Sequence, residues 1–130
     1  MPTDDLERDL RVLQRVAKKL GVSPLEFSAA QAIGRQENDA NFGVRSVKVA
    51  NQEQAARVLF NSLRNNVKRW EQAGKTGDFI DFMGSRWAPS GAENDPTDLN
   101  KNWAPGVKSI LKRDAPSDVY EQAKGAWNLP

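Results

Sequence analysis

The chain contains no cysteine and no histidine among its 130 residues. These absences exclude disulfides, thiol nucleophiles, Ser-His-Asp triads and nearly all of the ligand sets that hold zinc. Acid–base chemistry must therefore come from Asp, Glu, Lys or Tyr side chains. No metal or organic cofactor is indicated by any motif in the sequence.

The chain also lacks a long apolar run. No stretch approaches the roughly 20 apolar residues of a membrane-spanning helix. The acidic start, residues 1–5, has no hydrophobic segment of the kind found in a secretory signal. We therefore expect no membrane partner and no signal peptide. The net charge of +2 is compatible with an anionic polymer as a partner but does not identify one.

Strand patterns are scarce, whereas helix boundaries are frequent, so the sequence predicts an all-α single domain over residues 1–130. Ser23-Pro24-Leu25-Glu26 has the form of a capping box with proline at the first helical position. Gly21 and Gly74 are expected to end the first and third helices. The five to six expected helices cover about 3–20, 24–37, 51–73, 79–85, 105–113 and 119–124, with an ordered Pro-, Gly- and Asn-rich loop at 87–101.

Glu37 is the first candidate catalytic residue. It is expected at the end of the second helix, at the border of an apolar face that includes Ala29 and Ile33. Partial burial and the negative end of the helix dipole both favour the protonated carboxyl group, which suits a general acid. From helix position alone, a solvated carboxylate paired with Arg35 or Arg45 is the simpler interpretation.

The polar turn after this helix contains Asn41 and Phe42 and ends at Arg45. The amide groups of this turn are candidates to hydrogen-bond the hydroxyl or N-acetyl groups of a sugar, and the Phe42 ring is a candidate to stack on a pyranose face. The alternative is an ordinary Asx-rich turn whose Phe42 side chain lies in the core.

Three carboxylates, Asp39, Glu93 and Asp95, are candidates for a second catalytic group, because glycosidases normally use two. Asp95 also has a simple structural explanation as the cap of an Asn-Asp-Pro turn. A mechanism with one acid, in which the substrate's own hydroxyl or N-acetyl group replaces the second carboxylate, stays open.

Four tryptophans are many for a chain of this length. Indole faces commonly serve as platforms for sugar rings, so Trp87 and Trp103 are candidates to line a groove. Trp70 follows the helical spacing of core residues, and Trp127 in the tail is a candidate docking residue or lid.

The third helix has basic residues opposite its apolar stripe, namely Arg57, Arg64 and Lys68. A solvated helix face explains them. No groove-reading motif accompanies them, so we do not expect nucleic acid as a partner.

Taken in order, these segments resemble the lysozyme-like peptidoglycan hydrolase domains of bacteriophages and bacteria, a group with glucosaminidase-like and transglycosylase-like members. The resemblance covers about residues 23–111 and is strongest to virion-associated forms over 80–103. It is carried by Ile33 to Glu37, by Asn41-Phe42-Gly43-Val44-Arg45, and by Trp87-Ala88-Pro89 with Glu93-Asn94-Asp95. The chain differs from the family at Phe42 and Val44, where proline and asparagine are usual.

The resemblance implies a lysozyme-like helical fold, with Glu37 as the acid of a glycoside hydrolase or lytic transglycosylase. In this interpretation Asn41, Arg45, Trp87 and Asn94 position a peptidoglycan glycan strand, and Asp39 or Asp95 stabilises the transition state. The protein would belong to a phage virion and act in the bacterial periplasm or cell wall.

A second interpretation of a different class is a non-catalytic tail or baseplate protein that keeps the fold. Its partners would be other virion proteins. Residues 1–22 and 114–130 lie outside the resembling region, and they are the candidate docking helices in this case.

Overall fold

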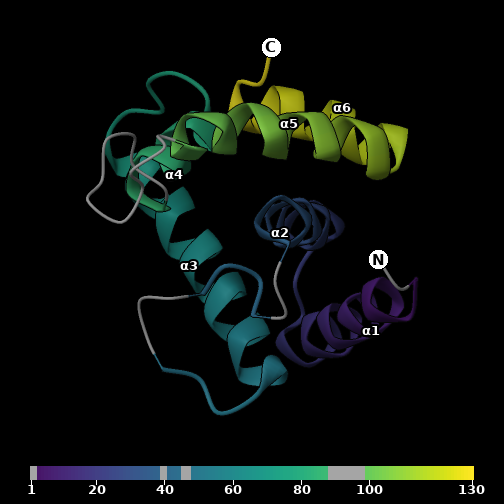
Figure 1. The fold of residues 1–130 in the computed structure, drawn as a ribbon. Helices are drawn as coiled ribbons and strands as arrows, with labels where there is room; N and C mark the ends of the chain where they lie inside the picture. The colour runs from purple at the N-terminus through teal and green to yellow at the C-terminus, as the bar shows by residue number, and fades with distance from the viewer. Residues whose placement is uncertain (1–2, 39–40, 45–47, 88–98) are drawn as a thin grey trace.

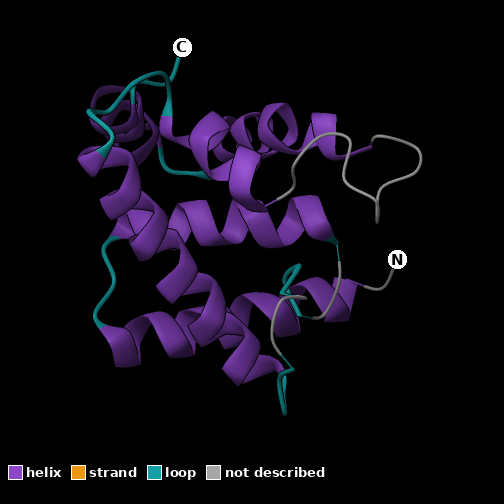
Figure 2. Cartoon of the chain, turned by 90° about the vertical axis from the view of Figure 1, so that its left-hand side faces the viewer, coloured by secondary structure: helices purple, strands orange, loops and turns teal. Residues whose placement is uncertain are grey.

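The computed structural model describes residues 3–38, 41–44, 48–87 and 99–130. Within these ranges the chain is helical and forms no strand (Figure 2), which confirms the predicted all-α class. The elements are α1 (Thr3–Leu20), α2 (Pro24–Glu37), α3 (Gln52–Gln72), α4 (Phe79–Trp87), the 3-10 helix η1 (Leu99–Asn102), α5 (Trp103–Asp114) and α6 (Ser117–Trp127).

Local capping explains where the helices begin. The hydroxyl group of Ser23 accepts a hydrogen bond from the Glu26 amide at 3.1 Å, and the Glu26 carboxylate accepts one from the Ser23 amide at 3.1 Å. The predicted capping box is thus confirmed. The side chain of Asn51 accepts a bond from the Gln54 amide at 2.8 Å and starts α3. Each cap satisfies an amide that the first helical turn leaves without a partner.

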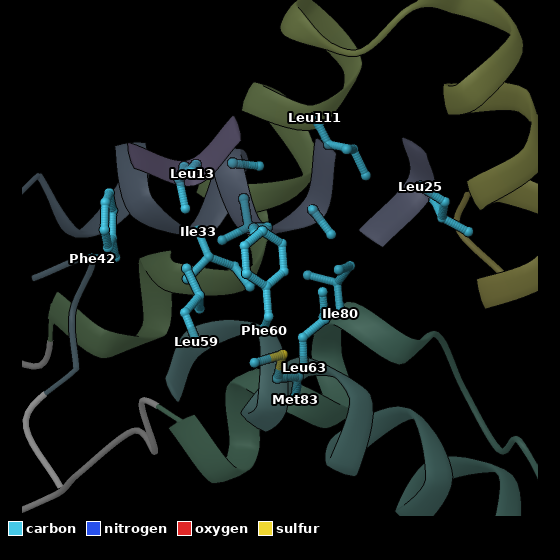
Figure 3. Close-up of a cluster of buried hydrophobic side chains, with 14 of the residues drawn as sticks. Leu13, Leu25, Ile33, Phe42, Leu59, Phe60, Leu63, Ile80, Met83 and Leu111 are labelled. Atoms are coloured by element: carbon cyan, nitrogen blue, oxygen red, sulfur yellow. The ribbon is translucent and has the colours of Figure 1, made fainter. Parts of the chain in front are cut away.

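Helix α2 lies at the centre of the molecule and is surrounded by α1, α3, α5 and α6 (Figure 1). Small side chains on α2, including Ala29, Ala30 and Ala32, are fully buried and let the neighbouring helices approach closely. The surrounding core is built from large apolar side chains of α3 and α4, such as Phe60, Leu63 and Met83 (Figure 3). This central position fixes the end of α2, and with it Glu37.

Helix α1 packs only part of its apolar face into the core. Its buried residues are Val12, Leu13, Val16 and Ala17, whereas Leu6 is 38% exposed. Leu6 and Leu10 instead line a cavity between α1, α2 and α5. One part of the apolar face of α1 is therefore packed in the core, and the part that includes Leu6 and Leu10 lines the cavity.

The C-terminal segment packs into the core. Trp127 and Leu129 are buried, and the Trp127 ring lies 4.9 Å from the ring of Phe79, centroid to centroid. The side-chain amide of Asn128 donates hydrogen bonds to the carbonyl groups of Lys75 and Gly77 at 3.1 and 3.2 Å. The apolar face of α6 is thus covered within the chain, so any docking by 114–130 would use polar side chains.

An ion-pair cluster connects α4 to α5. The ammonium group of Lys108 lies 2.7 Å from the Asp78 carboxylate and 2.8 Å from that of Asp81. Asp78 also accepts a hydrogen bond from the Asp81 amide at 2.7 Å and so caps α4. Burial acts to raise the pKa of Asp81, but hydrogen bonds from Lys108 and Asp78 and the lysine charge outweigh it, so the pKa lies below its usual value.

We expect Lys108→Met to lower the free energy of unfolding by about 1–3 kcal/mol at neutral pH, because the largely buried Asp78 carboxylate loses its charged partner. The lowered pKa of Asp81 means that this stabilisation is present above about pH 3.8 and is lost as the pH falls through the folded-state value. The hydrogen bonds to Asp78 and Asp81 raise the pKa of Lys108 despite its burial, so on the alkaline side the stabilisation is lost only above pH 10.5. Urea unfolding of both proteins from pH 2 to 7 measures the difference.

The matched control is Lys112→Met, which removes an exposed cation from the same helix and should change stability by less than about 0.5 kcal/mol. Equal effects of the two substitutions, or a Lys108→Met deficit that persists unchanged at pH 2, would contradict the role assigned to this cluster.

Candidate functional site

Glu37 is the last residue of α2, as the sequence predicts, and its side chain is half-buried. The helix ends because Asn38 adopts a left-handed backbone conformation with φ of 55°. The Asn38 amide donates a hydrogen bond to the carbonyl group of Gly34 at 3.0 Å and closes the last turn. This left-handed cap turns the chain sharply away from the helix axis directly after Glu37.

Residues 41–44 form a tight turn. The amide of Val44 donates a hydrogen bond to the Asn41 carbonyl group at 2.9 Å, and both central residues have positive φ, 54° at Phe42 and 80° at Gly43. Two successive positive φ values are typical of a type I′ turn. Glycine adopts this conformation freely, but a bulky residue such as Phe42 rarely does. The strain is of order 1–3 kcal/mol, and strain of this kind is common near functional sites.

The turn is held against the last turn of α2 by two close contacts. At Gly34, an added Cβ would lie 2.9 Å from Cδ1 of Phe42, so only glycine leaves room for the ring. At Gly43, an added Cβ would lie 2.7 Å from both Cδ and Oε2 of Glu37. The carboxyl group of Glu37 therefore rests directly on the backbone of the turn. The candidate acid and the candidate sugar-binding turn form one unit.

The described site residues separate into two groups. Asn41 is exposed, and Trp87, the last residue of α4, is half-buried. Phe42 and Trp103 are only 2% and 3% exposed, so their rings belong to the core. The core alternative for Phe42 is the one that the structure shows, and Trp103 packs on Gly84, where an added Cβ would lie 3.0 Å from its Cε3 atom. The remaining predicted residues, Asp39, Arg45, Glu93, Asn94 and Asp95, lie outside the described ranges.

A cavity of about 250 Å³ borders the same helix end. From α2 it is lined by Gln31, Gly34, Arg35 and Asn38, which share one helix face, and the Phe42 ring closes one side. Glu37 lies on the adjoining face and is not part of the lining. The cavity therefore adjoins the turn through Phe42 but is not lined by the candidate acid.

Gly34 and Gly43 have structural roles at the site that the sequence motifs do not predict. Each leaves room for one side chain, the Phe42 ring in one case and the Glu37 carboxyl group in the other. A sequence signal was available, because Gly34 interrupts the interior of a helix where glycine is unfavourable. Here the structure supplies a packing reason, because the Phe42 ring lies against Gly34.

No cluster of three or more Asp or Glu side chains that could hold a metal ion occurs in the part of the chain that the structure describes. None of the helices in that part is long and apolar enough to cross a bilayer. In comparisons with known proteins, no protein-family model, no curated protein sequence and no solved structure matches this chain.

Proposed function

We propose that the protein is a lysozyme-like domain of a phage, virion-associated, that cleaves the glycan strands of peptidoglycan with Glu37 as the general acid. The observation that carries the proposal is the placement of Glu37. Its half-buried carboxyl group rests on Gly43 of a strained turn at the end of the central helix. Glu37 is thus in contact with the turn at residues 41–44, and that turn is part of the motif that resembles the family.

Glu37 would protonate the oxygen that bridges two sugars as the glycosidic bond breaks. The turn fixes the carboxyl group on one side, which limits the rotamers that it can adopt. A positioned proton donor needs such a constraint, because small displacements of a catalytic group reduce the rate strongly.

Two described residues, the exposed Asn41 and the half-buried Trp87, are proposed to contact the glycan. Arg45 and Asn94 complete the set that the resemblance implies. Asp39 or Asp95 would stabilise the positive charge that develops on the sugar ring. We do not place Phe42 and Trp103 among the sugar-contacting residues, because both rings are buried.

The test is incubation of the purified protein with peptidoglycan, followed by mass analysis of the soluble products. We expect fragments that carry new sugar ends. The chemistry of those ends distinguishes a glucosaminidase, a muramidase and a transglycosylase. The absence of any released fragment, together with a high-mass assembly on sizing, would contradict the enzymatic proposal and favour the non-catalytic virion protein.

A further inference from the structure

The cavity beside α2 forms because α1 and α5 both pack on this helix but lie apart from each other (Figure 1). Part of its lining is Gly34, which has no side chain to fill the space. The volume is about 250 Å³. Since a cavity of about 150 Å³ can hold benzene, this one has space for a ligand on the order of ten non-hydrogen atoms.

Much of the cavity lining is apolar. Leu6 and Leu10 contribute from α1, and Ile110 contributes from α5. Leu6 is 38% exposed, more than any other large apolar side chain that the structure describes, and Leu10 and Ile110 are half-buried. Covering apolar surface of this kind is favourable, so the lining favours a ligand with an alkyl or aryl body.

The lining also carries two guanidinium groups, those of Arg35 and Arg113. Both pair with the Asp114 carboxylate, which lies 3.5 Å from Nε of Arg35 and 2.8 and 3.0 Å from Nε and Nη2 of Arg113. Two guanidinium groups present about ten N–H donors, whereas one carboxylate accepts about four hydrogen bonds. This group of three side chains therefore carries a charge of +1 and has more donors than Asp114 can accept from.

The third charged residue of the lining, Asp9, has its own partners. Its Oδ1 atom accepts a hydrogen bond from the side-chain amide of Gln52 at 2.5 Å and lies 3.9 Å from Nε of Arg8. The other polar side chains of the lining, Gln31 and Asn38, are uncharged. The two arginines are thus the groups of this cavity that favour a charged ligand, and the charge that they favour is negative.

Two other hollows of the described chain lack this combination. The groove between α2 and α3 has Arg64 and Lys68 in its lining. Glu26 and Glu71 balance these charges in the same lining. The hollow where α1 meets α2 is shallow, and Lys18 is the one charged residue of its lining. The cavity between α1, α2 and α5 therefore differs from both, because it joins an apolar wall to paired guanidinium groups with excess donors.

We propose that this cavity binds a small carboxylic acid with an alkyl or aryl body, on the order of ten non-hydrogen atoms in all. The body would lie against Leu6, Leu10 and Phe42. The carboxylate would accept hydrogen bonds from Arg35 and Arg113, since guanidinium groups bind carboxylates through two parallel hydrogen bonds. Small-molecule sites commonly combine apolar walls with a few polar groups that fix the orientation of the ligand.

The experiment measures binding of octanoate to the full chain by protein NMR at neutral pH. Octanamide is the neutral ligand of the same size, and octylamine is the cationic one. We expect octanoate to bind about tenfold or more tightly than octanamide, because hydrogen bonds between two charged groups are the stronger ones. Octylamine should bind more weakly than octanoate. Nuclear Overhauser contacts should join the alkyl chain to the Leu10 methyl groups and the Phe42 ring.

Arg113→Gln should weaken octanoate binding about fivefold or more and change octanamide binding by less than about twofold. Arg113 is exposed, so the variant should remain folded. The matched control is Lys112→Gln, which removes the neighbouring exposed cation of α5 from outside the lining. It should change the affinity for either ligand by less than about twofold.

Leu10→Trp should fill the cavity and abolish binding of both ligands. Gln14→Trp places the same side chain about one turn further along α1, at an exposed position outside the lining, and should bind octanoate as the parent does. Thermal unfolding checks that each variant is folded. The comparison of Arg113→Gln with Lys112→Gln does not depend on the tryptophan variants.

The proposal is overturned if octanoate does not bind, if octanamide or octylamine binds as tightly, or if octanoate contacts residues outside the lining. Equal losses in Arg113→Gln and Lys112→Gln would also overturn it. The site goes beyond the proposed function, because Glu37 does not line the cavity and binding is measured without peptidoglycan. Glu37→Gln should therefore bind octanoate as tightly as the parent does, whether or not the protein cleaves glycan strands.

Discussion

Glu37→Gln is expected to reduce the rate of peptidoglycan cleavage by about 10²–10⁴-fold, the range that a positioned general acid contributes. The amide has nearly the same shape as the carboxylic acid but cannot donate a proton to the leaving oxygen in the same way. The side chain should still rest on Gly43, so the free energy of unfolding should change by less than about 1 kcal/mol. Release of soluble sugar fragments over time gives the rate.

The control for this substitution is Glu71→Gln, which makes the same chemical change at an exposed position of α3. It should leave the rate within about twofold of the parent. If Glu37→Gln retains the parent rate, Glu37 is not the acid. If both substitutions reduce the rate equally, the effect is one of overall charge.

Gly43→Ala is expected to damage both stability and activity. A residue with a Cβ at φ of 80° is destabilised by about 1–2 kcal/mol relative to glycine. The new methyl group would also overlap the Glu37 carboxyl group, and overpacking of this kind adds about 1–3 kcal/mol. The displaced carboxyl group should lower the cleavage rate by about 100-fold or more.

Gly77→Ala separates the two contributions to this loss. Gly77 has a φ of 71°, but a Cβ there would meet nothing within 4 Å. Gly77→Ala should therefore lose only the stability that the positive φ costs a residue with a Cβ, about 1–2 kcal/mol. Combining Glu37→Ala with Gly43→Ala removes the overlapping atoms and should recover the steric part of the stability without restoring activity. Equal destabilisation by Gly43→Ala and Gly77→Ala would show that Glu37 does not rest on the turn. Denaturant unfolding measures all of these differences.

Much of the helical framework could be predicted because its determinants are local. The capping box at Ser23 and Glu26 and the Asn51 cap each involve residues three apart. Such interactions depend on the backbone of a single turn, so the sequence displays them directly. The position of Glu37 at a helix end follows from the same rules.

The contacts between distant segments could not be predicted. Arg64 of α3 donates a hydrogen bond to Glu26 across 38 residues, whereas the spacing of α3 alone predicts a solvated arginine. The burial of Phe42 depends on Gly34 eight residues earlier and on the left-handed turn that carries the ring back to the helix. Hydrophobic spacing alone also did not show that Leu6 and Leu10 of α1 line a cavity, because that cavity depends on how α2 and α5 pack beside α1.

The most direct measurement of the central claim is a crystal structure of the Glu37→Gln variant with a bound oligosaccharide of the peptidoglycan glycan strand. A bridging glycosidic oxygen should lie within about 2.6–3.2 Å of the side chain at position 37, with Asn41 in contact with an adjacent sugar. An oligosaccharide bound elsewhere on the molecule, with no glycosidic oxygen near position 37, would contradict it.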